Sequence, residues 1–391
     1  MRTRVAIIGA GPAGLLLAQL LHNEGIDSVV LESRSREHVE QRQRAGILEQ
    51  GTIDTLRSCG AGARMDREGM PHEGIELRFG RQSHRIDMAA LTGGREVMVY
   101  AQTEVVRDLI ALRLEAEKSL LFEAKALSVE GVETSTPVVH FEHDGQEHVL
   151  EADYVVGADG SHGVGRQAIP AEKVQTYERT YPYSWLGILA SVPPSNDELI
   201  YANHERGFAL HSMRSNSVTR LYLQVPNDTA IEDWSDERIW DELDLRFETT
   251  GDWKLQRGPI TSKSITPMRS FVSEPMRYGN LFLAGDAAHI VPPTGAKGLN
   301  LAAADVTLLA KALTGAVTGS DPSLLDAYSE SALRRVWRAE HFSYFMTTML
   351  HTDPDADEFT RRLQRSQLDY AVSSTAASTS LAENYVGLPH V

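Results

Sequence analysis

The chain has 391 residues, 42% of them hydrophobic, and a formal net charge of −16. This length suggests two or three domains, and the acidic charge argues against nucleic acid as a partner because it repels a phosphate backbone. The single cysteine, Cys59, excludes an intrachain disulfide and a zinc site built from several cysteines, so we expect no metal.

The N-terminal stretch 1–21 has basic residues followed by apolar ones, as a signal peptide does. Glycines and a proline at positions 9, 11, 12 and 14 interrupt it. We find no apolar run near 18 residues, so we expect no membrane span and a cytoplasmic location.

Strand-like and helical patterns alternate along the first part of the chain, beginning with a βαβ unit. The predicted elements, in order, are a strand at 5–8, a helix at 15–23, a strand at 28–32, a loop with a short helix at 33–46, helix broken at Gly51 and Gly60 over 47–70, strands with turns at Gly80 and 92–94 over 71–100, a helix at 102–117, and strands with a hairpin turn at 143–147 over 120–158.

The pattern changes near residue 181 and returns after residue 265. The predicted elements there are a three-stranded antiparallel meander at 198–226, a helix at 234–248, a strand at 280–286, long helices at 297–314, 323–350 and 356–370, and a mixed tail at 371–391. The simplest arrangement is a nucleotide-binding domain interrupted by an antiparallel domain and followed by a helical C-terminal part.

A glycine fingerprint lies between the first predicted strand and helix. "IIGAGPAG" places Gly9, Gly11 and Gly14 in the spacing G-x-G-x-x-G, with Ala13 inside the motif. The glycines allow a tight turn and close approach to a pyrophosphate, and a helix N-terminus favours phosphate. Glu32 ends the second strand, where a carboxylate accepts bonds from ribose hydroxyls. The pattern predicts a dinucleotide site without saying which; an ordinary glycine-rich turn is the alternative.

Two later strands also end in glycine–aspartate turns. Residues 154–166 contain Asp159 and Gly160, and residues 281–289 contain Asp286. Each turn alone is as well explained by ordinary strand-to-turn punctuation. In this order with the glycine fingerprint, they resemble the flavoprotein aromatic hydroxylases that use a single FAD. Stretches along the whole chain are similar to the 4-hydroxybenzoate-hydroxylating members, and they lie at 44–51, 101–105, 199–210, 211–215, 285–302 and 383–389.

The resemblance implies an α/β fold in which an antiparallel-sheet substrate domain interrupts a Rossmann-like FAD-binding domain, with a helical C-terminal part. It also implies a homodimer. The expected boundaries are 1–71, 101–180 and 266–345 for the FAD-binding domain, 72–100 and 181–265 for the substrate domain, and 346–391 for the C-terminal segment.

In this family, the residue matching Asp286 binds the FAD ribityl chain, and Asp159 and Gly160 match a segment that supports both nucleotides. We expect Pro292 and Pro293 to hold the next segment extended, so that the following helix points its N-terminus at flavin N1 and O2. The expected FAD-binding residues are Gly9, Gly11, Ala13, Gly14, Glu32, Arg42, Gln43, Arg44, Ala45, Gly46, Ile47, Gln102, Asp159, Asp286, Gly298, Leu299 and Asn300.

The chain has no second glycine fingerprint, so NAD(P)H must dock elsewhere. Residues matching Arg42, Arg44, His162 and Arg269 hold its phosphates in the family, and arginine suits phosphate by charge and geometry. Ordinary surface charge is the alternative reading of these four residues.

Residues 33–38 match the region that influences the choice of nicotinamide nucleotide in the family. Arg34 and Arg36 suit a 2′-phosphate, Glu37 opposes it, and His38 is a further candidate contact. We expect NADPH as the donor, with NADH as an alternative.

Ser212 and Arg214 are two residues apart on a predicted strand and so face the same side. Arg214 suits a carboxylate, and Tyr222 on the next strand adds a donor. In the family these positions bind the substrate carboxylate; a solvated arginine and a half-buried tyrosine are the alternative. Met213 is also a candidate substrate contact, although strand alternation predicts that it and His211 face away.

Tyr201 and Tyr385 are far apart in sequence, and no spacing pairs them. The resemblance implies that Tyr201 bonds the substrate phenol, that Tyr385 continues a proton relay, and that this relay ends near His72. The backbone of Pro293 and Thr294 would complete the phenol end. Each tyrosine alone is as well explained by packing, and the histidine by a surface position.

The resemblance implies hydroxylation of 4-hydroxybenzoate to 3,4-dihydroxybenzoate with NAD(P)H and O2, through a C4a-hydroperoxyflavin. Two alternatives stay open. One is the same chemistry on a related benzoate (3,4-dihydroxybenzoate, 3-hydroxybenzoate or 4-aminobenzoate), with Ile47 narrowing the pocket. The other is a flavin-binding redox sensor without turnover.

Overall fold

The computed structural model describes residues 1–41 and 46–388. A mainly parallel sheet carries the glycine fingerprint at the carboxyl end of its central strand, β1, which pairs in parallel with β2 and β11. The sheet consists of β1 (Arg2–Ile8), β2 (Ser28–Leu31), β8 (Leu120–Leu121), β9 (Lys125–Glu130), β10 (Val138–His143), β11 (Gln146–Gly157), β17 (Arg277–Tyr278) and β18 (Leu281–Leu283). Its strands β1, β2 and β18 are buried runs, as expected of parallel strands covered on both faces.

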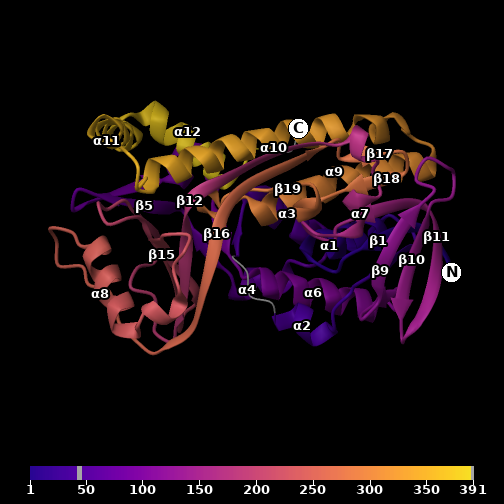
Figure 1. Cartoon of the computed structure of the whole chain (residues 1–391), viewed down its shortest axis with the longest axis horizontal. Coiled ribbons are helices and arrows are strands. Elements are labelled where there is room, and N and C mark those ends of the chain that lie inside the picture. Colours follow the sequence, from indigo (N-terminus) through magenta and orange to yellow (C-terminus); the bar gives the residue numbers. More distant parts are fainter. Residues whose placement is uncertain (42–45, 389–391) are drawn as a thin grey trace.

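Helices cover this sheet. α1 packs against α6 and α9, and α10 packs against α9. These helices are α1 (Pro12–Asn23), α6 (Gln102–Glu115), α9 (Gly298–Thr318) and α10 (Ser323–Leu350). In Figure 1, α10 runs along the top of the molecule from the parallel-sheet lobe to the other lobe. Helix α10 thus extends across both lobes.

Contrary to expectation, one helix of the described residues is long and apolar enough to cross a membrane by length and composition. This helix is α9, and most of its hydrophobic window is buried inside the protein. It lies between α1 and α10. A helix that is apolar on most sides is typical of a protein core as well as of a membrane, and here protein covers those sides.

A second large sheet forms the other lobe, antiparallel except where β13 pairs with β5. Its order is β19-β16-β12-β15-β14-β13-β5-β6. The strands are β5 (Gly74–Phe79), β6 (Gln82–Asp87), β12 (Gln175–Ala190), β13 (Leu199–Ala202), β14 (Ala209–Ser215), β15 (Val218–Val225), β16 (Ile260–Glu274) and β19 (His289–Ile290). The meander predicted over 198–226 is confirmed as β13, β14 and β15.

The third sheet is small and antiparallel, and in it β7 pairs with β3 and with β4. Its strands are β3 (Ile47–Leu48), β4 (Met70–His72) and β7 (Val97–Val99). The remaining helices are α2 (Arg36–Gln41), α3 (Gln50–Ser58), α4 (Ala63–Glu68), α5 (Met88–Thr92), α7 (Val164–Gln167), α8 (Asp236–Phe247), α11 (Glu358–Ser373) and α12 (Thr375–Val386). The domain boundaries predicted above stay a prediction.

Three details of the secondary structure differ from expectation. Gly51 does not break α3, because it lies in the first turn, where backbone N–H groups have no helical partner in any case. Helix α5 was not expected; Asp87 caps it by accepting from the Ala90 N–H at 2.9 Å. The tail predicted as mixed contains α12, which packs against α5.

Among the described residues, three histidines are buried and neutral at pH 7: His72, His211 and His351. Burial lowers the pKa of His72 to about 4 and the pKa values of His211 and His351 to about 3. The Nε2 atom of His211 accepts a hydrogen bond from the Ser195 N–H at 3.0 Å, as a neutral imidazole does.

We expect the protein to lose stability in mild acid. Each of these histidines has a pKa that is lower in the folded than in the unfolded protein, so unfolding takes up protons. Their contribution to the free energy of unfolding is therefore complete above about pH 6.5 and is lost as the pH falls toward 3. The free energy of unfolding should fall by roughly 1–4 kcal/mol per pH unit below pH 6, measured by thermal and urea unfolding between pH 7 and 5. His211→Gln, whose amide oxygen can still accept, should flatten this slope, whereas His341→Gln on the exposed face of α10 should not. Equal slopes in all three proteins would contradict this origin.

Candidate active site

The glycine fingerprint forms the turn between β1 and α1. Gly9 has φ +105°, and a Cβ at this position would lie 2.3 Å from the Ala158 carbonyl oxygen. A Cβ at Gly14 would lie 2.0 Å from the Gly9 carbonyl oxygen. By contrast, a Cβ at Gly11 meets no described atom within 4 Å. Gly9 and Gly14 are therefore needed for packing, and the space beside Gly11 is open to a pyrophosphate.

The Glu32 carboxylate lies beside this turn. Its Oε2 accepts from the Ala10 N–H at 2.8 Å, and its Oε1 accepts from the Arg34 N–H at 2.9 Å. These backbone bonds fix the carboxylate at the end of β2 next to the glycine turn, which is where an adenosine ribose would lie.

The second motif presents a buried acceptor. Asp159 Oδ2 accepts from the Gly165 N–H at 2.8 Å, whereas its Oδ1 has no hydrogen-bond partner among the described residues. Burial raises the pKa of Asp159. A buried carboxylate oxygen without a partner is costly, so it fits a nucleotide that supplies a donor.

The third motif joins the first. Gly285 has φ +60°, and a Cβ here would lie 3.5 Å from the Ala13 Cβ and 3.2 Å from the Ala302 Cβ. This close packing brings the Gly285 turn against α1 and α9, and Asp286 is exposed on it. The three motifs therefore meet at one edge of the parallel sheet, and the residues present fit FAD.

The segment after Asp286 differs in part from the prediction. Pro292 is extended (φ −55°, ψ 138°), but Pro293 begins a 3₁₀ turn, η4 (Pro293–Gly295), and Ala296 has φ +54°. The turn and the left-handed residue reverse the chain, so that α9 begins at Gly298 as expected. No side chain of the described residues caps this helix, which leaves its first N–H groups for a ligand.

The Asn300 side chain does not point to a ligand. It donates to the Ile47 and Ala296 carbonyls at 2.9 and 2.8 Å, and it accepts from the Glu49 N–H and the Thr52 hydroxyl at 2.9 and 2.8 Å. Asn300 thus holds the start of β3 and α3 against α9. Its FAD contact, if made, would come from its backbone, as would those of Gly298 and Leu299.

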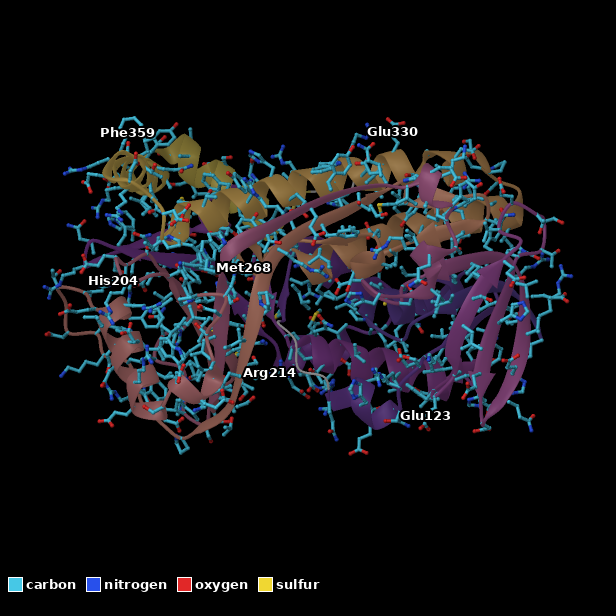
Figure 2. The ribbon with its side chains drawn as sticks, viewed as in Figure 1. Glu123, His204, Arg214, Met268, Glu330 and Phe359 are labelled. Atoms are coloured by element: carbon cyan, nitrogen blue, oxygen red, sulfur yellow. The ribbon has the colours of Figure 1, made fainter. Side chains whose placement is uncertain are left out.

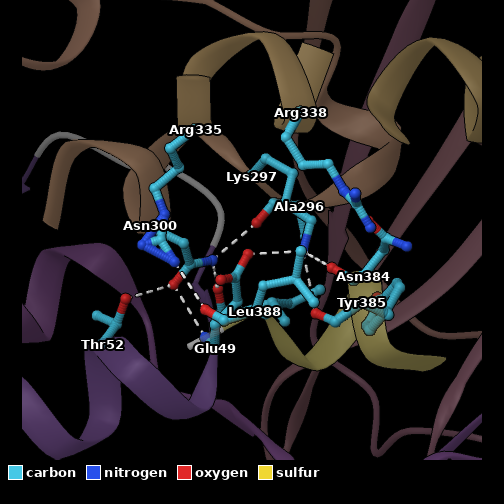
Figure 3. A network of polar contacts seen from close by, with 12 residues as sticks. Glu49, Thr52, Ala296, Lys297, Asn300, Arg335, Arg338, Asn384, Tyr385 and Leu388 are labelled. Carbon is cyan, nitrogen blue, oxygen red and sulfur yellow. Dashed lines mark hydrogen bonds and ion pairs between the residues drawn. The ribbon is translucent and has the colours of Figure 1, made fainter. Parts of the chain in front are cut away.

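Lys297 ties the start of α9 to the C-terminal segment (Figure 3). Its buried Nζ donates to Glu49 Oε1 at 2.6 Å, to the Tyr385 carbonyl at 3.1 Å and to the Asn384 carbonyl. Burial lowers the pKa of Lys297. Arg335 donates to the Leu388 carbonyl at 2.7 Å beside this cluster. Lys297 was not among the predicted residues.

A cavity of about 50 Å³ lies next to these elements. Tyr201, Leu210 and Tyr222 are directly opposite one another on β13, β14 and β15, so their side chains share one face of the sheet. The cavity is lined by Gly46, Ile47, Val99, Ala101, Trp185, Tyr201, Leu210, Ser212, Met213, Arg214, Arg220, Tyr222, Pro293 and Ala296. Gln102 begins α6 next to Ala101.

Ser212 and Arg214 both line the cavity, as strand alternation predicts, but Met213 lines it as well. The expectation that Met213 faces away is therefore wrong. The reason is a register shift between Met213 and Ser215, where a bulge interrupts the alternation. His211, before the bulge, does point to the other side, where its ring contacts that of Phe247.

Arg214 lies between the two lobes (Figure 2). Its Nη2 donates to the Thr103 hydroxyl of α6 at 3.0 Å, which joins the substrate sheet to the first lobe. Burial and the nearby Arg220 lower the pKa of Arg214. Two adjacent guanidinium groups, half-buried beside a cavity, are stabilised by an anionic ligand. Arg220 and Thr103 were not among the predicted residues.

At another part of the cavity wall, the hydroxyls of Tyr201 and Tyr385 are 2.6 Å apart and buried. Burial and the neighbouring Tyr385 raise the pKa of Tyr201. Pro293 lines the cavity, whereas the Thr294 hydroxyl points away and accepts from the Thr347 hydroxyl at 2.9 Å. His72 is buried, and its Nδ1 has no partner among the described residues.

Of the residues expected to hold the nicotinamide nucleotide, those that the structure describes lie on several different elements. Arg42, Gln43, Arg44 and Ala45 lie outside the described residues. His162 is exposed before α7, and Arg269 on β16 lies 3.7 Å from Glu178. Arg34 lies just before α2 and His38 lies within it, and both are exposed. Figure 1 shows α2 at the bottom of the lobe, away from β16.

Arg166 is the last residue of the second motif, lies close to Arg269 and was not predicted. It donates to the Ala287 and Ser161 carbonyls at 3.1 and 2.6 Å and stacks on Phe271. Burial lowers its pKa, and Asp159 and Arg269 are close enough to contribute. Its place at the end of "GADGSHGVGR" was the available signal.

Comparison with known proteins decides the family. The family described as "FAD binding domain" matches residues 2–343. The chain is 50% identical over 390 residues to the p-hydroxybenzoate hydroxylase of Acinetobacter baylyi. The matched residues make up 100% of this chain and 96% of that protein. This chain belongs to the FAD-binding aromatic hydroxylases. It is also 27% identical over 339 residues to an uncharacterized aromatic compound monooxygenase of Bacillus subtilis, covering 84% of this chain and 65% of that one.

The fold of this hydroxylase is shared with a solved structure, the p-nitrophenol 4-monooxygenase from Pseudomonas putida. The TM-score is 0.84 at 19% identity, over 99% of each chain. The predictions of an α/β fold, of FAD as cofactor and of monooxygenase chemistry are confirmed.

A pair of glycine variants of the hydroxylase separates packing from cofactor binding. Gly14→Ala should destabilise the apoprotein by about 2–3 kcal/mol, because the methyl group meets backbone. Gly11→Ala should leave the apoprotein within about 0.5 kcal/mol of wild type and weaken FAD binding about tenfold or more, because the methyl group fills the pyrophosphate space. Thermal unfolding of the apoprotein and fluorescence titration with FAD measure both. Equal destabilisation by the two variants would contradict this division.

Proposed function

We propose that this hydroxylase converts 4-hydroxybenzoate to 3,4-dihydroxybenzoate with NADPH and O2. One observation carries the proposal: a single cavity is lined by Arg214, Ser212 and Tyr222 and also by Tyr201 of the buried tyrosine pair. Arg214, with Ser212 and Tyr222, is suited to bind a carboxylate. The hydroxyl of Tyr201 is suited to bind a phenol. The p-hydroxybenzoate hydroxylase at 50% identity supports the same substrate.

The arrangement on the sheet gives the two groups a suitable separation. Tyr201 is level with Leu210 on β14, and Ser212 lies two residues farther along that strand, roughly 7 Å away. This is about the length of one benzene ring with its substituents. The guanidinium of Arg214 would form a charged hydrogen bond with the carboxylate, while Trp185 and Leu210 would contact the ring.

The buried tyrosine pair controls the phenol proton. Because the hydroxyls of Tyr201 and Tyr385 are within hydrogen-bond distance, Tyr201 can accept the phenol proton of the substrate while it passes its own proton to Tyr385. The pKa of Tyr201 is raised, so Tyr201 stays protonated and acts as a donor to a phenolate. The pKa of His72 is about 4, so its imidazole is neutral at pH 7 and can accept a hydrogen bond. We propose His72 as the acceptor at the end of this relay.

FAD, when bound, supplies the redox chemistry: it takes hydride from the nicotinamide nucleotide and, with O2, delivers one oxygen atom to the ring. The chain's own part is to hold the ring acid beside the start of α9, to keep water from the cavity and to release the phenol proton. The oxygen enters next to the phenol carbon because a phenolate is most nucleophilic there.

For the nicotinamide nucleotide we propose NADPH. Arg166, Arg269 and the exposed Arg34 are cations near the FAD-binding edge. Arg36 is less suited to a 2′-phosphate than expected, because its Nε is paired with Glu40 at 2.6 Å. The alternatives are a related benzoate as substrate, or a flavin-binding sensor without turnover; the buried tyrosine pair argues against the sensor, which needs no phenol-proton path.

The test is oxidation of NADPH and NADH by the purified protein, with and without 4-hydroxybenzoate, with the product identified by chromatography. We expect strong stimulation, formation of 3,4-dihydroxybenzoate and faster reaction with NADPH. Arg214→Met should raise the KM for 4-hydroxybenzoate about 10–100-fold, because a charged hydrogen bond is lost, whereas Arg257→Met on the surface should not. Stimulation that yields only hydrogen peroxide would indicate another benzoate, and no stimulation with any benzoate would indicate the sensor.

We also propose a homodimer. Large apolar side chains are exposed on α10 and α11: Trp337, Phe359, Leu363 and Tyr370. Figure 2 shows Phe359 at the outer surface, and it is 71% exposed. Light scattering should give the mass of two chains for the wild type, and Phe359→Asp should shift it toward one chain, whereas Leu127→Asp on β9 should not. A monomeric wild type would contradict the proposal.

A further inference from the structure

The C-terminal end of α10 carries two buried polar side chains that the proposed reaction does not use. They are Thr347, in the last turn of the helix, and His351, directly after it. Both are almost completely buried. Because they are four residues apart, their side chains lie on the same side of the helix end.

The hydrogen bonds of His351 define its tautomer. Its Nδ1 lies 3.0 Å from the Thr347 carbonyl, which can only accept, so Nδ1 carries the proton. Its Nε2 therefore accepts, and the donor is the indole Nε1–H of Trp185 at 2.6 Å. Burial lowers the pKa of His351 to about 3, so this neutral form is present at pH 7.

Aromatic rings hold the imidazole in place. The ring of His351 stacks on Phe208, with centroids 4.3 Å apart, and on Tyr183, with centroids 4.7 Å apart and planes 8° from parallel. A ring stacked in this way has little freedom to turn, so it fixes the direction in which the Trp185 indole points. Trp185 in turn lines the substrate cavity and contacts Tyr222 at 4.7 Å between centroids.

Thr347 holds a different part of the cavity wall. Its hydroxyl donates to the Thr294 hydroxyl at 2.9 Å, and Thr294 belongs to η4, whose Pro293 lines the cavity. The η4 turn also packs closely against α10, because a Cβ at Gly295 would lie 2.9 Å from the hydroxyl oxygen of Ser343, one turn before Thr347. The same helix end thus bonds both Trp185 and the η4 turn.

We propose that Thr347 and His351 are positioning residues that fix the separation of Trp185 from the Pro293–Thr294 turn and thereby determine which ring acids the cavity accepts. This rests on the proposed function, because it concerns selectivity at the same site. Neither residue touches the substrate. Loss of either bond leaves a buried donor or acceptor without its partner, and the wall shifts to recover one, which widens or skews the space for the ring.

The first test compares His351→Phe, which keeps a stacking ring and loses both nitrogens, with the control His341→Gln on the exposed face of α10. Protein labelled with ¹⁵N-tryptophan gives one indole N–H resonance for each of its five tryptophans, and Trp185→Phe assigns the relevant one. We expect His351→Phe to move the Trp185 resonance upfield and the control to leave it unchanged. A merely structural loss of stability would move several resonances together.

The second readout is binding of benzoates, followed by the change in flavin absorbance of the holoenzyme. We expect His351→Phe to weaken 4-hydroxybenzoate binding about tenfold and to reduce the preference over 3,4-dihydroxybenzoate at least threefold. His351→Gln, whose amide oxygen can accept from the indole, should restore most of both. Thr347→Val should weaken 4-hydroxybenzoate binding without moving the Trp185 resonance, and Thr347→Ser should restore it.

An unchanged Trp185 resonance in His351→Phe would overturn the proposal, and so would a shifted resonance with wild-type affinity and selectivity. If the wild type binds no 4-hydroxybenzoate, the proposed function is wrong. The resonance and the selectivity among whichever benzoates do bind still decide the role of His351, so the two failures are distinguishable.

Discussion

The buried ammonium group of Lys297 imposes a constraint on which the rest of the site depends. A charge removed from water must be paired and hydrogen-bonded, and the partners of Lys297 are the Glu49 carboxylate and the carbonyls of Asn384 and Tyr385. These partners come from the start of α3 and from α12. Satisfying one charge therefore holds the N-terminus of α9, the β3–α3 segment and Tyr385 in a single arrangement.

That arrangement explains why a C-terminal residue takes part in the substrate site. Tyr385 is 184 positions from Tyr201 in the chain, and the last segment would fray without specific ties. Lys297 binds its backbone, Arg335 binds the Leu388 carbonyl, and α12 packs on α5. These backbone ties, together with the edge contact between the rings of Tyr385 and Phe342, place the hydroxyl of Tyr385 against Tyr201.

The sequence predicted those parts of the site that local geometry determines. The Gly9, Gly11 and Gly14 spacing is set by one turn, and Ser212 and Arg214 share a face through the period of a strand. Met213 was assigned to the wrong face because a bulge depends on pairing with β15, which the sequence of β14 alone does not show.

Long-range pairs could not be derived in this way. Tyr201 with Tyr385, and Lys297 with Glu49, are joined by the tertiary structure, and only the family resemblance pointed to the tyrosines. Helix α12 was missed because "TAASTS" is rich in small and hydroxylated residues with weak helix preference; its packing against α5 supplies the stability that its sequence does not.

The charge around the substrate cavity is opposite in sign to the net charge of the chain. The chain carries −16 overall, which would repel a carboxylate at long range, yet Arg214 and Arg220 both line the cavity. Surface charges are screened by salt over about 10 Å, whereas charges around a low-dielectric cavity act at close range. Two guanidinium groups that line the same cavity, one of them with a lowered pKa, suit the binding of an anion there.

The same reasoning makes the two lobes one functional unit. Arg214 reaches from β14 to Thr103 on α6, and α10 extends from the parallel-sheet lobe, where Tyr328 donates to the Leu283 carbonyl at 2.8 Å, to Trp185 at the substrate cavity. The flavin-binding edge and the wall of the substrate cavity are therefore connected by one continuous helix and by a direct bond between side chains of the two lobes.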